Sequence, residues 1–191
     1  MRLPRPGCAV NRVRKPLRVL ESKRLTLVAA SSELVAADLA GIAAFSAELG
    51  AIVPPEWPPA LFGGSVMRAV QAQLLNPAEH GWSAWYLLDA QPVPPVAIGM
   101  CQFKGRPDAA GAVEISYAIL DRYRGRGYAT EAVARLVTWA FGHQNVQQVT
   151  AETLPHLRNS IRVLEKVGMA PAGKGSEQGV VRYAIRKDGS R

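Results

Sequence analysis

The stretch ISYAILDRYRGRGYATEAVARLVTWA, residues 115–140, decides the fold of this 191-residue chain. Its β-branched and aromatic start, residues 115–120, predicts a strand, and its apolar spacing from Tyr128 to Ala140 predicts a helix. The turn between them contains Gly125 and Gly127, which lack a Cβ and let the backbone approach a ligand closely. Free N–H groups at the helix start, the helix dipole and three arginines of the turn favour an anion there. The stretch therefore predicts a strand, a phosphate cradle and a helix.

Two common phosphate-binding motifs do not fit this turn. No Gly-Lys-Ser/Thr follows the glycines, and Thr130 stands where the dinucleotide fingerprint requires a third glycine. The spacing Arg122-x-x-Gly125-x-Gly127 instead resembles the pyrophosphate motif of the GNAT acetyltransferases, and within them the RimJ/RimL-like branch. Three flanking stretches add to the resemblance: EISY at 114–117 as the central strand, SIRVLEKVGM at 160–169, and SKRLTL at 22–27 as the first strand.

The resemblance implies an α/β (α+β) fold of the GNAT type, a mixed, mostly antiparallel, splayed sheet flanked by helices. We expect one such domain over residues 22–188. Hydrophobic patterns and turn signals predict strands at 24–29, 82–88, 96–103, 115–120, 146–154 and 180–185. They predict helices from Ser31, divided at Gly41, and at 66–75, 128–140 and 160–167. The proline cluster at 54–59 excludes a helix interior, and the glycines at 173–179 indicate a hairpin turn rather than a second phosphate loop.

The resemblance implies that acetyl-CoA is the cosubstrate. Its pyrophosphate would sit on the backbone N–H groups of Arg124, Gly125, Arg126, Gly127, Tyr128, Ala129 and Thr130. Its pantetheine arm would pair with the backbone of Tyr117, Ala118 and Ile119 as an added strand, because the central strand and the next one splay apart in the family. Asn159 would contact the same cofactor. The alternative for the glycine turn is an ordinary strand-to-helix connection, which two glycines and three arginines in six residues disfavour.

The implied reaction is direct attack by a neutral primary amine on the thioester, so a base is useful. Glu114 is the candidate base, because it opens the predicted strand and matches an acidic position of the family; the alternative is a solvated or arginine-paired carboxylate. Ser160 is the candidate donor to the leaving sulfur, with a helix N-cap as its alternative role. The tyrosine that many members use as general acid aligns with Leu164, which puts that acid in doubt.

The acceptor stays open at this point: a protein N-terminus, an amino acid, a polyamine or a related small amine. Trp57, Glu56 and Tyr183 are candidates for its pocket, and the alternative for Trp57, which we favour over the pocket role, is that it fills a surface groove of its own domain. A rival function is a non-catalytic acyl-CoA-binding or sensor domain of the same fold. His143 and His156 are not at metal-ligand spacing, so no metal is predicted.

Composition limits the remaining possibilities. The formal charge is +8, but residues 1–24 contain eight Lys or Arg and one acid, so the rest of the chain is close to neutral. We expect residues 1–21 to be a disordered basic tail, with contact to RNA or the ribosome as the alternative. Cys8 and Cys101 are not expected to pair, which fits the cytoplasm. No apolar run is long enough to span a membrane. The oligomeric state, monomer or homodimer, is open.

Overall fold

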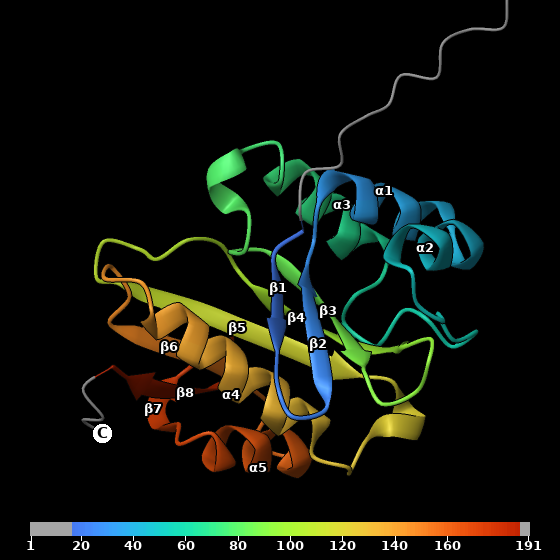
Figure 1. Ribbon diagram of the computed structural model, residues 1–191. Coiled ribbons are helices and arrows are strands. Elements are labelled where there is room, and N and C mark those ends of the chain that lie inside the picture. The colour runs from blue at the N-terminus through green and yellow to red at the C-terminus, as the bar shows by residue number, and fades with distance from the viewer. Residues whose placement is uncertain (1–16, 188–191) are drawn as a thin grey trace, which may run out of the picture.

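One mixed sheet organises residues 17–187, which are the residues that this computed structural model describes (Figure 1). Its eight strands lie in the order β1 (Val19–Glu21), β2 (Leu25–Ala29), β3 (Ala84–Asp89), β4 (Val96–Phe103), β5 (Ala112–Ile119), β6 (Gln148–Thr153), β8 (Val181–Arg186) and β7 (Ala170–Lys174). Neighbouring strands pair antiparallel except β5 and β6, which are parallel. The predicted mixed, mostly antiparallel sheet is therefore confirmed.

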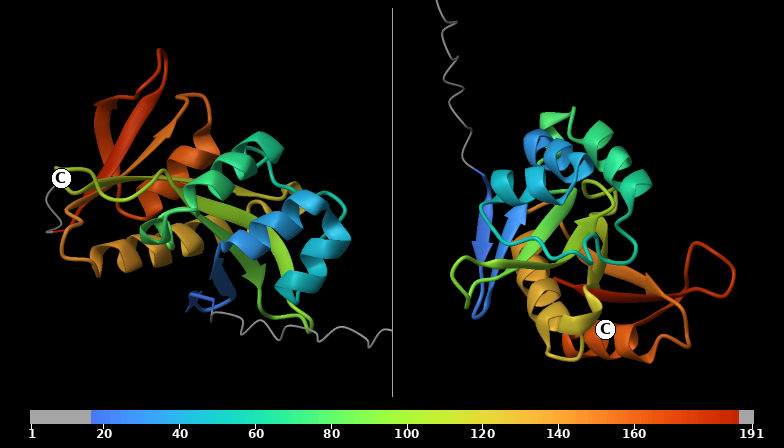
Figure 2. Two further views of the ribbon diagram at one scale, coloured as in Figure 1. Left: turned by 90° about the horizontal axis from the view of Figure 1, so that it is seen from above. Right: turned by 90° about the vertical axis from the view of Figure 1, so that its right-hand side faces the viewer.

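Helices cover both faces of this sheet (Figure 2). One face carries α1 (Ser32–Ala40), α2 (Ile42–Leu49) and α3 (Gly64–Gln73), and the other carries α4 (Tyr128–Phe141) and α5 (Arg158–Lys166). Two short 3-10 turns, η1 (Pro77–Glu79) and η2 (Asp121–Tyr123), lie in connections. Each face has its own apolar core, with Phe45 and Tyr86 in the α1–α3 core and Leu136 and Val137 in the α4–α5 core. The sheet thus separates two apolar layers, and Tyr123 of η2 packs against both.

Local signals set the ends of the first helices as predicted. The Ser31 hydroxyl accepts a hydrogen bond of 3.2 Å from the backbone N–H of Leu34 and so caps α1. Gly41, at φ 120°, ends α1 and precedes α2. Helix α3 runs from Gly64 to Gln73, two residues earlier at each end than predicted.

The sequence misplaces the start of the domain. Val19–Glu21 form β1 and pair with β2, and the carbonyl of Arg18 accepts a 2.9 Å hydrogen bond from the N–H of Ala29. Leu20 packs against the α4–α5 core. The end of the expected tail is therefore ordered sheet, and residues 1–16 of it lie outside the described residues. A strand of three residues is too short to show a period of two, which explains the error.

The opposite edge of the sheet was also incomplete in the prediction. Ala170–Lys174 form β7 and pair with β8 around the predicted 173–179 turn, so the hairpin is confirmed and its first strand was missed. Pro171 lies in this strand, and proline is tolerated there because β7 is an edge strand.

The parallel pair of strands opens into a splay. β5 and β6 pair only where Ala112, Val113 and Glu114 face residues 148–150. Beyond that point, residues 115–119 of β5 have no partner strand on the β6 side. On the other side, the N–H of Lys104 donates to the carbonyl of Glu114, and the N–H of Leu120 donates to that of Ile98, both at 2.9 Å. Since antiparallel bonding alternates, the backbone groups of the odd-numbered residues point into the splay.

Candidate functional site

The glycine turn forms an open concave backbone at the start of α4. Gly125 and Gly127 have φ values of 74° and 82°, in the left-handed region that favours glycine. A Cβ on Gly125 would meet no atom within 4 Å, and one on Gly127 would meet only the Nη2 of Arg24, at 3.5 Å. The first intrahelical donor is the N–H of Glu131, bonded to the carbonyl of Gly127 at 3.0 Å. The N–H groups of residues 128–130 therefore have no acceptor within the helix, and the turn fits an anion such as a pyrophosphate.

The three arginines of the turn are held by ion pairs, a hydrogen bond and a contact with an aromatic ring. Arg122 forms an exposed ion pair of 3.4 Å with Glu56. Arg124 pairs with Asp121 at 2.9 Å, and its Nε donates to the carbonyl of Ile119 at 3.1 Å, at the upper end of the splay. The guanidinium of Arg126 lies 5.7 Å from the ring centre of Tyr123. Two of the three arginines are thus paired with carboxylates, which lowers the net positive charge at the turn.

A fourth arginine joins the cradle from the β1–β2 turn, and the sequence analysis missed it. The Nε of Arg24 donates to Glu131 Oε2 at 2.8 Å, and its backbone N–H donates to Oε1 at 2.7 Å. The Nη1 of Arg24 donates to the carbonyl of Arg126 at 3.0 Å, and the guanidinium lies 4.4 Å from the ring centre of Tyr128. These contacts link residues more than 100 positions apart, so no local pattern could reveal them.

A hydroxyl pair lies on the α4–α5 face of the splay. The Tyr117 hydroxyl lies 3.1 Å from both the carbonyl oxygen and the Oγ of Ser160. Burial raises the pKa of Tyr117 to about 12, although the hydrogen bond with Ser160 opposes the shift. Tyr117 is therefore a neutral hydrogen-bonding group at physiological pH. The structure thus brings together two predicted site residues, Tyr117 and Ser160. Tyr117 was expected to act through its backbone, and here its side chain makes the contact.

The helix-capping alternative for Ser160 is wrong. α5 begins at Arg158 with Leu157 as its N-cap, and that cap makes no side-chain hydrogen bond. Ser160 is the third residue of the helix, and Asn159, the second, is exposed. Leu164, at the position of the family tyrosine, is fully buried and has no proton to give. Ser160 and Tyr117 therefore supply the hydroxyl groups here, and Leu164 supplies none.

Glu114 lies on the other face of the sheet, the face of α1–α3. It is the third residue of β5 rather than the first, and it forms an ion pair with the Nζ of Lys104. Its side chain is 21% exposed. Ala118 shares this face, and its backbone groups bond towards β4 by the same alternation, so only its side chain can contact a ligand. Glu114 and Ser160 therefore approach the splay from opposite faces.

The predicted acceptor-pocket residues are mostly core. Trp57 is 8% exposed, and its indole N–H donates to Asp38 Oδ1 at 2.8 Å, while the Tyr86 hydroxyl donates to Oδ2 at 3.2 Å. Burial raises the pKa of Asp38, although both hydrogen bonds oppose that shift. Tyr183 is also buried, in the α4–α5 core. Of the three predicted residues only Glu56, paired with Arg122, lies at the surface.

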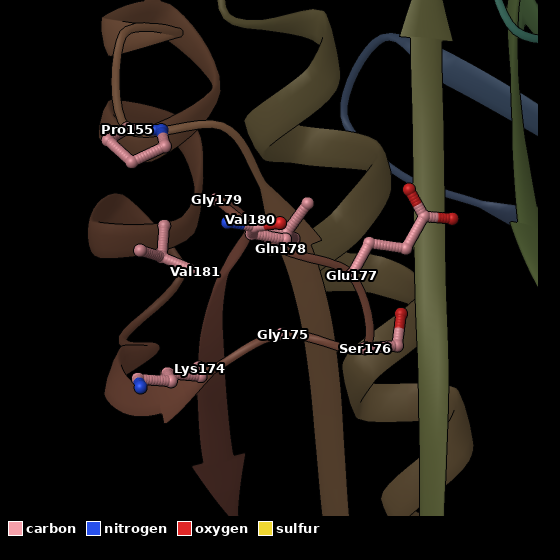
Figure 3. A pocket seen from close by; sticks show the side chains of 9 residues that line it. All are labelled: Pro155, Lys174, Gly175, Ser176, Glu177, Gln178, Gly179, Val180 and Val181. Carbon is pink, nitrogen blue, oxygen red and sulfur yellow. The ribbon is translucent and has the colours of Figure 1, made fainter.

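A cavity of about 580 Å³ lies beside the β7–β8 hairpin (Figure 3). It is lined by Pro155 and residues 174–181, next to the end of β6 that diverges from β5. In Figure 3, Ser176 and Glu177 point to one side of the loop and Lys174 to the other. Glu152 holds the loop, because it accepts bonds of 2.9 Å and 2.7 Å from the N–H and hydroxyl of Ser176. The cavity therefore has a fixed wall on the β6 side of the splay.

Within residues 17–187, no group of three or more His, Cys, Asp or Glu is placed to hold a metal ion. The Nδ1 of His143 lies 3.0 Å from the carbonyl oxygen of Trp139, and its ring packs against two tryptophans. No helix of the described part of the chain is both long and apolar enough to cross a membrane.

A family model and two curated relatives match this chain. The family model described as an acetyltransferase (GNAT) domain matches residues 24–170. The uncharacterized N-acetyltransferase YjdG of Bacillus subtilis is 28% identical over 130 residues, which cover 68% of this chain and 76% of that protein. The uncharacterized N-acetyltransferase p20 of Bacillus licheniformis is 30% identical over 76 residues, 40% of this chain and 43% of its own.

Solved structures share the fold at low sequence identity. RimL, a ribosomal L7/L12 alpha-N-protein acetyltransferase in complex with coenzyme A, has a TM-score of 0.65 and 18% identity over 91% of this chain and 100% of its own. The ribosomal-protein-S5-alanine acetyltransferase of Vibrio fischeri has a TM-score of 0.63 and 17% identity, over 90% and 97% of the two chains.

Proposed function

The chain belongs to the GNAT acetyltransferase family, and we propose that it moves an acetyl group from acetyl-CoA to a primary amine in the splay between β5 and β6. The observation that carries the proposal is the conjunction of the free β5 edge with the open glycine turn at the start of α4. Acetyl-CoA has an arm with amide groups, which can pair with the edge of a strand, and phosphates, which need an anion site. Here the strand edge and the anion site are adjacent.

We propose that the cofactor lies across the α4–α5 face of the splay. The N–H groups of residues 125–130 would hold the pyrophosphate, whereas the N–H of Arg124, also predicted for this role, already donates to the carbonyl of Asp121 at 3.1 Å. The backbone groups of Tyr117 and Ile119 would bond the pantetheine arm. The fit is supported by the empty space above Gly125 and by the unpaired first-turn N–H groups of α4. Arg124 would have to share or release the carbonyl of Ile119 when the arm binds. Asn159, which is exposed, would contribute a contact at the surface of the same site.

The proposed chemistry uses both faces of β5. The amine would enter from the α1–α3 face, where Glu114 would take a proton from it directly or through water. Its lone pair would attack the thioester carbonyl, the C–S bond would break, and the thiolate would leave towards Ser160 and Tyr117. An ordinary thiol has a pKa of about 8.5. Tyr117, whose pKa is raised to about 12, is too weak an acid to protonate such a thiolate, so its role is hydrogen bonding.

The acceptor that we propose first is the α-amine of a protein or peptide. RimL and the S5-alanine enzyme, which share the fold, are named for acetylating ribosomal proteins. An α-amino group has a pKa of roughly 7.7–8.0, against about 10.4 for a lysine side chain, so far more of it is neutral at pH 7. A carboxylate already engaged with Lys104, as Glu114 is, suits an acceptor that needs little help to lose its proton.

An acceptor screen tests the proposal. The full chain is mixed with acetyl-CoA and, in separate wells, with peptides of varied first residue, free amino acids and polyamines, and the released thiol is measured. Release above the no-acceptor rate with the peptides is the expected result. The same peptides with blocked α-amines serve as the control and should release nothing. If the chain binds CoA but no amine releases thiol, acetyl transfer is refuted and the runner-up applies.

That runner-up is an acyl-CoA-binding or sensor domain without turnover. The observation that favours it is the buried Leu164 at the position where many relatives carry a tyrosine acid. A nucleic-acid-binding module has weaker support, because the charge outside residues 1–24 is close to neutral. Salt-dependent RNA binding that persists after removal of the first 21 residues would favour it.

A further inference from the structure

Arg24, in the turn between β1 and β2, reaches the glycine cradle from a distant part of the chain. Its side chain is 27% exposed, and its guanidinium makes contacts on three sides, with Glu131, with the carbonyl of Arg126 and with the ring of Tyr128. Tyr128 is itself fixed, because its hydroxyl donates to the buried Asp89 at 2.8 Å. The orientation of the guanidinium is therefore set before any ligand arrives.

One edge of this guanidinium is left for a ligand. Nε donates to Glu131 and Nη1 donates to Arg126, while no partner is recorded for Nη2 within residues 17–187. Nη2 lies 3.5 Å from the point that a Cβ of Gly127 would occupy, which is the open space above the cradle. An arginine with two donors fixed and one aimed into an anion site is preorganised to bind phosphate oxygen.

Glu131 makes this arginine necessary. It is a carboxylate in the first turn of α4, beside the N–H groups that an anion needs. Burial raises its pKa, but its hydrogen bonds from Arg24 and Ser22 and the charge of Arg24 outweigh burial and leave the pKa below its ordinary value. The carboxylate is therefore ionised, and without a counter-charge it would repel a phosphate. Both oxygens of Glu131 are engaged, because Ser22 Oγ donates to Oε1 at 2.8 Å and Arg24 donates to Oε1 and Oε2.

We propose that Arg24 is a cofactor-phosphate residue with two roles: its Nη2 binds a phosphate of acetyl-CoA at Gly127, and its charge cancels that of Glu131 at the same site. The proposal rests on the proposed function, since it assumes that CoA occupies the cradle. It assigns a ligand-binding role to a residue outside the glycine motif, in the turn before the first long strand.

The test separates phosphate binding from mere support of the fold. Arg24→Ala and Arg24→Gln are compared with the wild type for CoA affinity by calorimetry and for kcat/KM with acetyl-CoA and with S-acetylpantetheine, which lacks the pyrophosphate. Arg24→Gln keeps a side-chain donor to Glu131 and serves if the alanine variant does not fold. Affinity for CoA should fall roughly 10- to 100-fold, the range of one or two charge-assisted hydrogen bonds. kcat/KM with S-acetylpantetheine should change less than about threefold, because that substrate has no phosphate to lose.

Two further variants sharpen the result. Arg24→Gln combined with Glu131→Gln should bind CoA more tightly than Arg24→Gln alone, because the unmasked charge is gone. Arg135→Ala is the matched control: its Nε joins the same helix to the same hairpin through the carbonyl of Glu21 at 2.9 Å, but away from the cradle. It should bind CoA like the wild type.

Three results would overturn the proposal. Equal losses with acetyl-CoA and S-acetylpantetheine would make Arg24 a structural residue only. A double variant no better than Arg24→Gln would remove the masking role. Unchanged CoA affinity in the Arg24 variants, while the wild type binds CoA, would remove the phosphate role and leave the proposed function standing. A wild-type chain that does not bind CoA would instead refute the proposed function itself.

Discussion

Substitution of Gly127 is the sharpest test of the cradle, because its two consequences can be calculated separately. The residue has φ 82° and is the N-cap of α4. A left-handed conformation costs a residue with a Cβ about 1–2 kcal/mol. In the free protein the new Cβ would meet only Arg24 Nη2 at 3.5 Å, an ordinary contact, so Gly127→Ala should lose little beyond that strain. For a domain of this size the melting temperature should fall by about 2–8 °C.

The effect on the ligand should be larger than the effect on stability. A Cβ at Gly127 projects into the space where a phosphate must approach the N–H groups of the turn. Loss of one or two charge-assisted hydrogen bonds, at about 1.5–3 kcal/mol each, predicts a fall in CoA affinity of at least about 10-fold. Gly127→Asn separates the causes, because asparagine tolerates the left-handed conformation. It should be more stable than Gly127→Ala but equally poor at binding CoA.

Gly50→Ala is the matched control for this experiment. Gly50 ends α2 at φ 67°, with nothing within 4 Å of its would-be Cβ, and it lies outside the cradle. The variant should lose similar stability and keep its CoA affinity. Calorimetric titration with CoA and thermal unfolding give both quantities. A folded Gly127→Ala protein that binds CoA as tightly as the wild type would show that the phosphates do not approach this turn.

Three further predictions follow from named contacts. Glu114→Gln should lower turnover roughly 10²–10⁴-fold with little change in CoA affinity, less so at high pH, and wild-type turnover at pH 7 would exclude Glu114 as the base. A chain that starts at residue 22 should melt several degrees below one that starts at residue 17, since it lacks β1; equal melting temperatures would mean that β1 adds nothing. The free energy of unfolding of the wild type should exceed that of Glu131→Gln most above pH 4.5, the ordinary pKa of this group, because a lowered pKa stabilises the charged form. That advantage should shrink as the pH falls below 4.5, and a pH-independent difference would contradict it.

The sequence predicts those parts of the site that depend on neighbouring residues. The glycine turn, the start of α4 at Tyr128 and the cap of α1 at Ser31 are set by residues within a few positions of one another, and all are confirmed. The resemblance also supplied the splay, which no hydrophobic pattern could show, because it is a matter of which backbone groups stay unpaired.

What the sequence misses depends on contacts between distant residues. The sequence predicts Arg24 only as the start of a strand. Its contact with Glu131, 107 positions away, makes it part of the cradle. Tyr117 was expected to act through its backbone, and its hydroxyl meets Ser160 only because α5 packs over the splay. Trp57 lies in a proline-rich loop of the kind that often carries binding residues. Its indole N–H, however, already donates a hydrogen bond to Asp38.

The register of β5 connects these observations. In a strand, alternate side chains face opposite sides of the sheet, and alternate backbone groups face opposite neighbours. The even-numbered residues of β5 bond to β4, and their side chains, Glu114 among them, lie on the α1–α3 face. The odd-numbered residues turn their backbone to the splay and their side chains to the α4–α5 face, where Tyr117 meets Ser160 of α5. One strand can thus hold a thioester by its edge, receive an amine on one face and solvate the leaving sulfur on the other. A shift of one residue in the pairing with β4 would move every side chain of β5 to the opposite face and turn the other set of backbone groups to the splay. The site therefore depends on this register as much as on any single side chain.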